Sequence, residues 1–105
     1  HPDNREYAVH YAEGLTQLAS ALEALDRPDE GFVCRRTAIR VCEPLVRSRP
    51  DRSGARSALA AFRSALANVL ARRGANEEAV ALFAEATNDL RELIELEPNF
   101  PPRYE

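Results

Sequence analysis

The side chains of this chain with the widest chemical range are two cysteines and two histidines. Cys34 and Cys42 are eight residues apart. On one helix that spacing separates them by about 12 Å along the axis, which is too far for a disulfide. Neither His1 nor His10 stands close to a cysteine in the paired spacing typical of zinc sites. We therefore expect two buried structural cysteines, no metal and no cofactor.

The hydroxyl-bearing residues form no recognisable catalytic set. Serines and threonines are few, and no glycine-rich phosphate loop is present. No Ser, His and Asp stand in a setting that would activate a nucleophile. The sequence therefore predicts a protein that is not an enzyme.

The charged residues carry more information. The chain has fourteen basic and seventeen acidic residues, a net charge of −3, and general binding to nucleic acid or anionic membranes is not expected. Every basic residue is an arginine, which favours a GC-rich bacterial genome. The charges are segregated: residues 1–30 carry seven acids and two arginines, residues 35–63 eight arginines and two acids, and residues 77–105 eight acids and two arginines.

Three arginines, Arg36, Arg40 and Arg47, share one stripe when the basic segment is drawn as a helix. One interpretation is structural: the basic helix lies beside a later acidic helix, and the alternation of charge fixes their register. The acids concerned are Glu85, Asp89 and Glu92. The other interpretation is an anion-facing patch for an acidic peptide or a phosphate group. The sequence leaves both open.

The elements that position these residues repeat at a fixed interval. Shifted by 48 positions, the chain aligns with itself without a gap, and Leu18, for example, falls on Leu66. Such a period is typical of repeat arrays. The prolines that recur at this interval are Pro2, Pro50 and Pro98. Because proline has no N–H and ends helices, we expect these prolines to separate successive hairpins.

Each repeat contains two segments with apolar residues at helical spacing, and none alternates as a strand does. The fold class is therefore all-α, with four long helices. We expect helices at about residues 5–25 and 28–47 of repeat one (1–50) and about 52–73 and 76–96 of repeat two (51–98), with 99–105 as the start of a next repeat or a tail. The stripe expected to face the core from the first helix is Tyr7, Tyr11, Leu15, Leu18, Leu22 and Leu25. Pro44 lies inside the second helix, where we expect a kink or a stop and restart.

The repeats resemble the tetratricopeptide repeat (TPR) family. Its pattern W-x2-L-G-x2-Y…A-x3-F…P is matched by Arg63-x2-Leu66-Ala67-x2-Leu70, Ala79-x3-Phe83 and Pro98, and by Leu15-x2-Leu18-Ala19-x2-Leu22, Gly31-x3-Arg35 and Pro50. Arg63 replaces the family's bulky first residue, and Arg35 replaces its aromatic residue. The period of 48, against the family's 34, lengthens each helix by about two turns, as in long-repeat bacterial variants.

The resemblance implies two tandem antiparallel hairpins in a right-handed α-solenoid, whose first helices line a concave face that receives a protein or peptide partner. Carried over to this chain, the residues of that face are Glu13, Thr16, Ser20, Glu23, Ala61, Ser64, Asn68 and Arg72. Asn68 matches a position where peptide-binding members often place an asparagine. The lysine and arginine of the same clamp are missing here.

Two functions are therefore open as hypotheses. The first is protein–protein interaction, as a scaffold or sensor module of a larger cytoplasmic regulatory protein that docks a peptide or helix on the first-helix face. The alternative is a structural spacer or self-association unit with no external ligand. Repeat arrays usually need three or more units for stability, so two alanine-rich repeats leave apolar ends through which a homodimer would form.

Overall fold

The structure is a computed structural model that describes residues 4–48 and 54–96. Within these ranges it confirms an all-helical fold with four helices: α1 (Asn4–Ala24), α2 (Pro28–Ser48), α3 (Gly54–Arg72) and α4 (Asn76–Leu96). Their ends lie within two residues of the expected ones, and the described ranges contain no strand. The three prolines expected to separate hairpins, Pro2, Pro50 and Pro98, lie outside the described residues.

The two hairpins turn in the same way. The amide of Arg27 donates to the carbonyl of Leu22 at 2.8 Å, and 48 residues later the amide of Ala75 donates to the carbonyl of Leu70 at 2.9 Å. Both turns contain a residue in the left-handed conformation at the same repeat position. It is Asp26 in the first turn, with φ of 63°, and Gly74 in the second, with φ of 86°. Glycine adopts this conformation without a steric cost. The self-alignment of the sequence is therefore repeated in the backbone.

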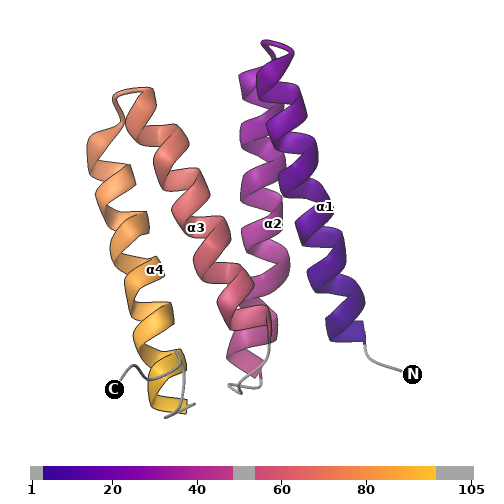
Figure 1. The fold of residues 1–105 in the computed structure, drawn as a ribbon, viewed down its shortest axis with the longest axis vertical. Helices are drawn as coiled ribbons and strands as arrows, with labels where there is room; N and C mark the ends of the chain where they lie inside the picture. The colour runs from indigo at the N-terminus through magenta and orange to yellow at the C-terminus, as the bar shows by residue number, and fades with distance from the viewer. Residues whose placement is uncertain (1–3, 49–53, 97–105) are drawn as a thin grey trace, which may run out of the picture.

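The helices form two hairpins that meet through α2 and α3. Helix α1 packs against α2, and α3 packs against α4, α2 and α1. Figure 1 shows α2 and α3 between the outer helices α1 and α4. Within the described ranges, the backbone of α4 contacts neither α1 nor α2. Helix α3 is therefore the element that joins both hairpins.

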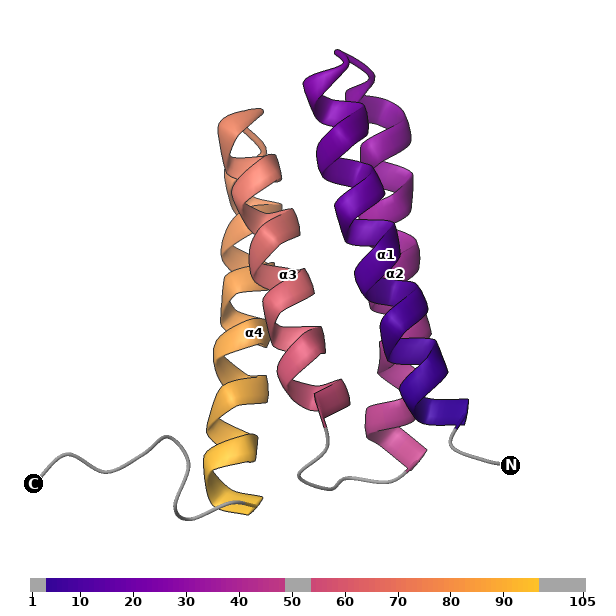
Figure 2. The ribbon, with the colours of Figure 1, turned by 45° about the vertical axis from the view of Figure 1, so that its right-hand side comes forward.

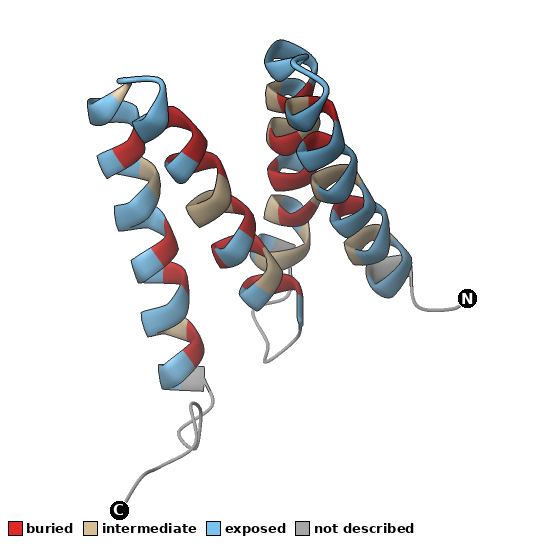
Figure 3. Cartoon of the chain, turned by 45° about the horizontal axis from the view of Figure 1, so that its top comes forward, coloured by how far each residue is buried: buried red, intermediate tan, exposed pale blue. Residues whose placement is uncertain are grey.

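The core is small in its side chains and lies mainly between the hairpins. Figure 3 shows the buried positions along the facing sides of the helices. The buried cluster consists of Ala12, Ala38, Ile39, Cys42, Leu59, Phe62, Leu66, Ala67, Leu70 and Ala79. Small residues permit close helix packing, most clearly at Gly31, where an added Cβ would lie 3.0 Å from the carbonyl oxygen of Ala19. Close approach of backbones here replaces burial of large side chains.

The core-facing stripe expected for the first helix is partly wrong. Leu22 is buried and Leu15 packs against the core, but the side chains of Tyr7 and Leu25 are 67% and 66% exposed; Tyr11 and Leu18 are exposed as well. The buried positions of α1 are Ala12, Ala19 and Leu22. Four of the six large apolar residues thus lie on the exposed side of α1.

For α2 one expectation is narrowed and another needs correction. The helix runs without a break from Pro28 to Ser48, so of the two alternatives expected at Pro44 the stop and restart is excluded. Pro44 is exposed, and since it has no N–H, the carbonyl of Arg40 loses one intrahelical donor at the surface. Of the two cysteines, Cys42 is fully buried but Cys34 is only half-buried.

None of the helices in the described ranges combines the length and the apolarity needed to cross a membrane.

Candidate interaction surfaces

The residues predicted for the first-helix face lie on α1 and α3, which pack against each other. Glu13, Ser20, Asn68 and Arg72 are exposed. Thr16, Glu23 and Ser64 are half-buried. We call these seven residues, with the exposed Ala61, the first-helix face. Figure 2 shows α1 and α3 in front of α2 and α4.

On the α1 side of this face, much of the polar capacity is already used. The guanidinium of Arg35 on α2 donates to both carboxylate oxygens of Glu23, at 2.8 and 3.0 Å, and to the hydroxyl of Ser20 at 3.2 Å. These hydrogen bonds lower the pKa of Glu23, and the charges of Arg72 and Arg73 act in the same direction. Glu23 is thus a structural partner of Arg35 and holds α1 against α2.

The remaining α1 residues of the face make local contacts. The hydroxyl of Thr16 donates to the carbonyl of Glu13 at 2.8 Å, one turn earlier in the helix. The carboxylate of Glu13 lies 3.3 Å from Nδ1 of His10, and Glu6 lies 3.8 Å from the other ring nitrogen. The described residues hold no group of three or more His, Cys, Asp or Glu side chains arranged to bind a metal.

The α3 side of the face is open. A row of residues at spacings of three and four runs along one side of the helix. All of them are exposed except Ser64, which is half-buried. The row consists of Ser57, Ala61, Ser64, Asn68 and Arg72. Within the described ranges, Ser64, Asn68 and Arg72 make no side-chain hydrogen bond or ion pair. A row of small side chains ending in a free amide and a free guanidinium leaves room for a partner backbone to approach.

The three arginines predicted as a patch are not equivalent. Arg36 lies over the ring of Phe32, 5.0 Å from its centroid, and 3.8 Å from Glu78 of α4. Arg40 and Arg47 are exposed, and neither pairs with an acid of the described residues. Arg36 and Arg40 line a shared hollow of 220 Å³ between α2, α3 and α4, whereas Arg47 does not.

That hollow carries mixed charge. Its other lining residues are Ile39, Glu43, Arg63, Leu82 and Glu85. Both carboxylates in it are directed to Arg63, at 3.0 Å from Glu43 and 3.7 Å from Glu85. Three arginines set against two glutamates leave a weak positive excess, centred on Arg40. This mixed charge supports an anion-binding patch less than the arginine stripe of the sequence suggested.

Sequence reasoning missed a network of buried arginines. Arg63 donates to Asp89 of α4 at 2.7 Å, and their side chains are only 13% and 8% exposed. Burial raises the pKa of Asp89, although the hydrogen bond from Arg63 acts in the opposite direction. Arg56, also buried, donates to Glu92 of α4. Nε of both arginines lacks a hydrogen-bond acceptor, so the network is not fully satisfied.

The network also corrects the structural interpretation of the alternating charges. The acidic stripe of α4 was expected to pair with the basic helix α2. Instead Asp89 and Glu92 pair with arginines of α3. Between α2 and α4, Arg36 forms an ion pair with Glu78 at the longer distance of 3.8 Å. The sequence feature that could have indicated this network is Arg63 itself, a charged residue at a position where the TPR pattern has a bulky apolar residue.

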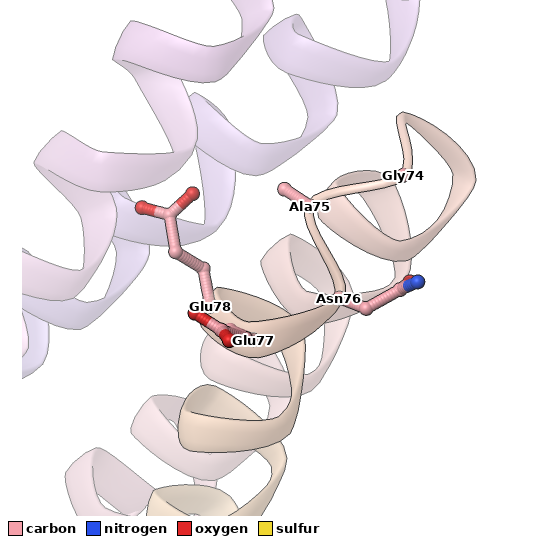
Figure 4. A pocket seen from close by; sticks show the side chains of 5 residues that line it. All are labelled: Gly74, Ala75, Asn76, Glu77 and Glu78. Atoms are coloured by element: carbon pink, nitrogen blue, oxygen red, sulfur yellow. The ribbon is translucent and has the colours of Figure 1, made fainter.

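A second hollow lies at the turn between α3 and α4 (Figure 4). It has a volume of 330 Å³ and is lined by Gly74, Ala75, Asn76, Glu77 and Glu78. The side chain of Glu78 extends toward the neighbouring hairpin, and Asn76 points away from it. With two carboxylates at a helix N-terminus, whose partial positive charge they already offset, this hollow does not attract an anion.

Comparison of the chain with family models, with curated proteins and with solved structures finds no match.

Proposed function

We propose that this chain is a protein-interaction module built from two tandem TPR-like hairpins in a right-handed α-solenoid. The support for the repeat arrangement is internal. The two hairpins turn identically at Leu22–Arg27 and Leu70–Ala75, and α3 packs against both helices of the first hairpin. The absence of lysine and the two free cysteines fit a scaffold or sensor module of a larger regulatory protein in the bacterial cytoplasm.

The partner in this proposal is an extended peptide or a helix that docks on the first-helix face. The observation that carries it is the exposed row on α3, in which small side chains are followed by Asn68 and Arg72, whose side chains make no hydrogen bond or ion pair within the described ranges. Amide and guanidinium groups at this end of the row suit a peptide carboxylate, since Arg binds carboxylates through paired N–H donors. Glu23 is occupied by Arg35, so it repels such a carboxylate less than a free acid would.

The test is a selection from a displayed library of random peptides with free C-terminal carboxylates, followed by affinity measurements on the enriched sequences. Removing a charged hydrogen-bonding group costs about 1.5–3 kcal/mol, so Arg72→Glu should weaken binding about tenfold or more. Asn68→Ala should weaken it less. The matched control is Arg40→Glu, which changes an exposed arginine that lines the hollow between α2, α3 and α4.

The outcomes separate the surfaces. Weakening by Arg72→Glu with unchanged binding of Arg40→Glu supports the first-helix face. The reverse pattern moves the site to the hollow between α2 and α4 and refutes the proposal. Failure to enrich any peptide also refutes it.

A further inference from the structure

Helix α1 presents an apolar stripe to solvent from Tyr7 to Leu25, the residue that follows its last turn. We call it the α1 end face, and its residues are Tyr7, Tyr11, Gly14, Leu18, Ala21 and Leu25. All six are exposed, with the side chains of Tyr7, Tyr11, Leu18 and Leu25 between 49% and 67% exposed. The spacing alternates between four and three residues, so the six side chains share one side of the helix.

Helix α4 presents a similar stripe at the other side of the molecule. We call it the α4 end face, and its residues are Val80, Phe83, Thr87, Leu90 and Ile94. All five are exposed, with the four apolar side chains between 38% and 66% exposed. Figure 1 shows that α1 and α4 are the two outermost helices. The chain thus carries two separate apolar faces that none of its described residues covers.

The 48-residue repeat identifies what such faces do. Counting 48 residues on from the α1 end face, Leu25 falls on the exposed Arg73, just beyond α3, and the other five residues fall on Ala55, Leu59, Phe62, Leu66 and Val69 of α3. These five residues are all buried. Counting 48 residues back from the α4 end face gives Phe32, Arg35, Ile39, Cys42 and Val46 of α2. The apolar members of this second set belong to the cluster that contains Leu59, Phe62 and Leu66, or pack against it.

The two buried sets are therefore the two halves of the contact between hairpins, where α2 packs against α3. The two end faces are the equivalents of these two halves one repeat away, and they are exposed. One chain carries both: the α2-like half on α4 and the α3-like half on α1.

We infer that the α4 end face of one copy packs on the α1 end face of a second copy, head to tail, in the way that α2 packs on α3 within the chain. The occupant is a second copy because each chain supplies both complementary halves. The inference concerns surfaces other than the first-helix face, so it stands or fails independently of peptide binding.

The intermolecular contact is weaker than the internal one, for two reasons. Gly14 stands where α3 has Phe62, and Thr87 stands where α2 has Ile39, so the middle of the contact is less filled. Both ends of the chain are also acidic, since residues 1–30 and 77–105 each carry an excess of acids. Added salt screens their repulsion and should strengthen the association.

A head-to-tail contact uses two different surfaces, so it does not close on itself in pairs but adds copies to a growing chain. The first measurement is the solution mass of residues 1–105 by light scattering, across a concentration series at low and high salt. The expected result is a mass that rises with concentration without a plateau at the dimer, and more steeply at high salt. A monomer under all these conditions overturns the inference.

Two variants then identify the faces. Leu18→Glu blocks the α1 end face and Leu90→Glu blocks the α4 end face, each at an exposed position where a charge is compatible with folding. Each variant alone should be a helical monomer by light scattering and circular dichroism. Their equimolar mixture should form a one-to-one complex, because each keeps the half that the other has lost.

The controls distinguish this contact from other ways of associating. Val33→Glu removes an exposed apolar side chain of α2, 62% exposed, that belongs to neither end face, and it should associate as the wild type does. Thr87→Ile restores the residue type of the internal contact and should tighten association about tenfold. Association of either blocked variant alone, or a mixture that stays monomeric, refutes the head-to-tail arrangement.

Discussion

Replacement of Arg63 by alanine tests whether the buried charges hold the second hairpin together. The side chains of Arg63 and Asp89 are 13% and 8% exposed and lie 2.7 Å apart. Removing one member of a buried pair costs about 3–5 kcal/mol because the other charge remains buried. The contacts to the more exposed Glu43 and Glu85 add at most about 1 kcal/mol. We expect Arg63→Ala to lose about 3 kcal/mol of the roughly 5–15 kcal/mol available to a chain of this size.

A double variant separates the loss of a charge from the loss of packing. At the equivalent positions of the first hairpin, 48 residues earlier, the chain has Leu15 and Val41, which pack against the core. Arg63→Leu combined with Asp89→Val transfers this apolar pair to the second hairpin. Because apolar replacement of a whole buried pair is often neutral or stabilising, we expect its stability to lie within about 1 kcal/mol of the wild type or above it.

The assay is urea unfolding followed by circular dichroism, with the free energy of unfolding extrapolated to water. The matched control is Arg91→Ala, which removes an exposed arginine of α4 that donates to Asn88; it should change stability by less than about 0.5 kcal/mol. Two results would refute the reasoning. One is an Arg63→Ala variant as stable as Arg91→Ala, and the other is a double variant less stable than Arg63→Leu alone.

Three further predictions concern the first hairpin and its cysteines. Glu23→Gln removes a carboxylate whose pKa is lowered below its ordinary 4.5 by hydrogen bonds from a buried arginine of α2. The wild type should therefore exceed this variant in stability above pH 4.5 and lose that advantage as the pH falls below it, and a pH-independent difference in urea unfolding would contradict this. Gly31→Ala should destabilise the fold by about 1 kcal/mol, because the new Cβ lies 3.0 Å from a backbone carbonyl of α1. Gly14→Ala, with no atom within 4 Å of its new Cβ, should stabilise it by about 0.5–1 kcal/mol, and equal thermal shifts for the two variants would show that the close approach is unimportant. Cys42 is fully buried, and burial raises its pKa to about 11, so a thiol reagent should label the half-buried Cys34 first and Cys42 only on unfolding; mass spectrometry of partly labelled native protein checks the order.

Much of the fold was predictable because it depends on local rules. Helical spacing of apolar residues and turn residues such as Pro28 and Gly74 act within a few positions of the chain. Pro28 begins α2, where its missing N–H costs nothing. The 48-residue self-alignment predicted two equivalent hairpins, and the equivalent turns agree with that prediction.

The orientation of α1 was not predictable in the same way. Its stripes of apolar residues overlap, and both Leu15 and Leu18 fit a core-facing helix. The choice between them depends on which neighbours the helix meets, and that is a property of the whole fold. In α3 the stripe equivalent to Leu18 is buried against the preceding hairpin; in α1 the same stripe is exposed, so identical spacing yields opposite burial.

The helices that carry the residues of the first-helix face were predictable, but the availability of their side chains was not. The sequence placed Glu23 and Ser20 on the first-helix face, and both are partly exposed or exposed. It gave no sign that Arg35, twelve residues beyond Glu23, reaches back to occupy them. Pairs between side chains on different helices depend on the rotation of each helix, which a one-dimensional pattern does not contain.

The location of the buried charges explains how hairpins of this chain can stack on one another and still keep their own partners. Arg35 pairs with Glu23 inside the first hairpin, and Arg63 pairs with Asp89 inside the second, while the more exposed Glu43 of α2 adds a contact to Arg63 across the two hairpins at 3.0 Å. The contact between hairpins is instead made largely by the apolar cluster around Leu66. A buried charge tolerates only its own partner, since any other leaves it unpaired at a cost of several kcal/mol. An apolar face accepts any other apolar face of similar shape. Exchange of helices between unlike hairpins is therefore penalised, while stacking of whole hairpins is not, and this combination favours end-to-end association of hairpins that keep their own helix partners.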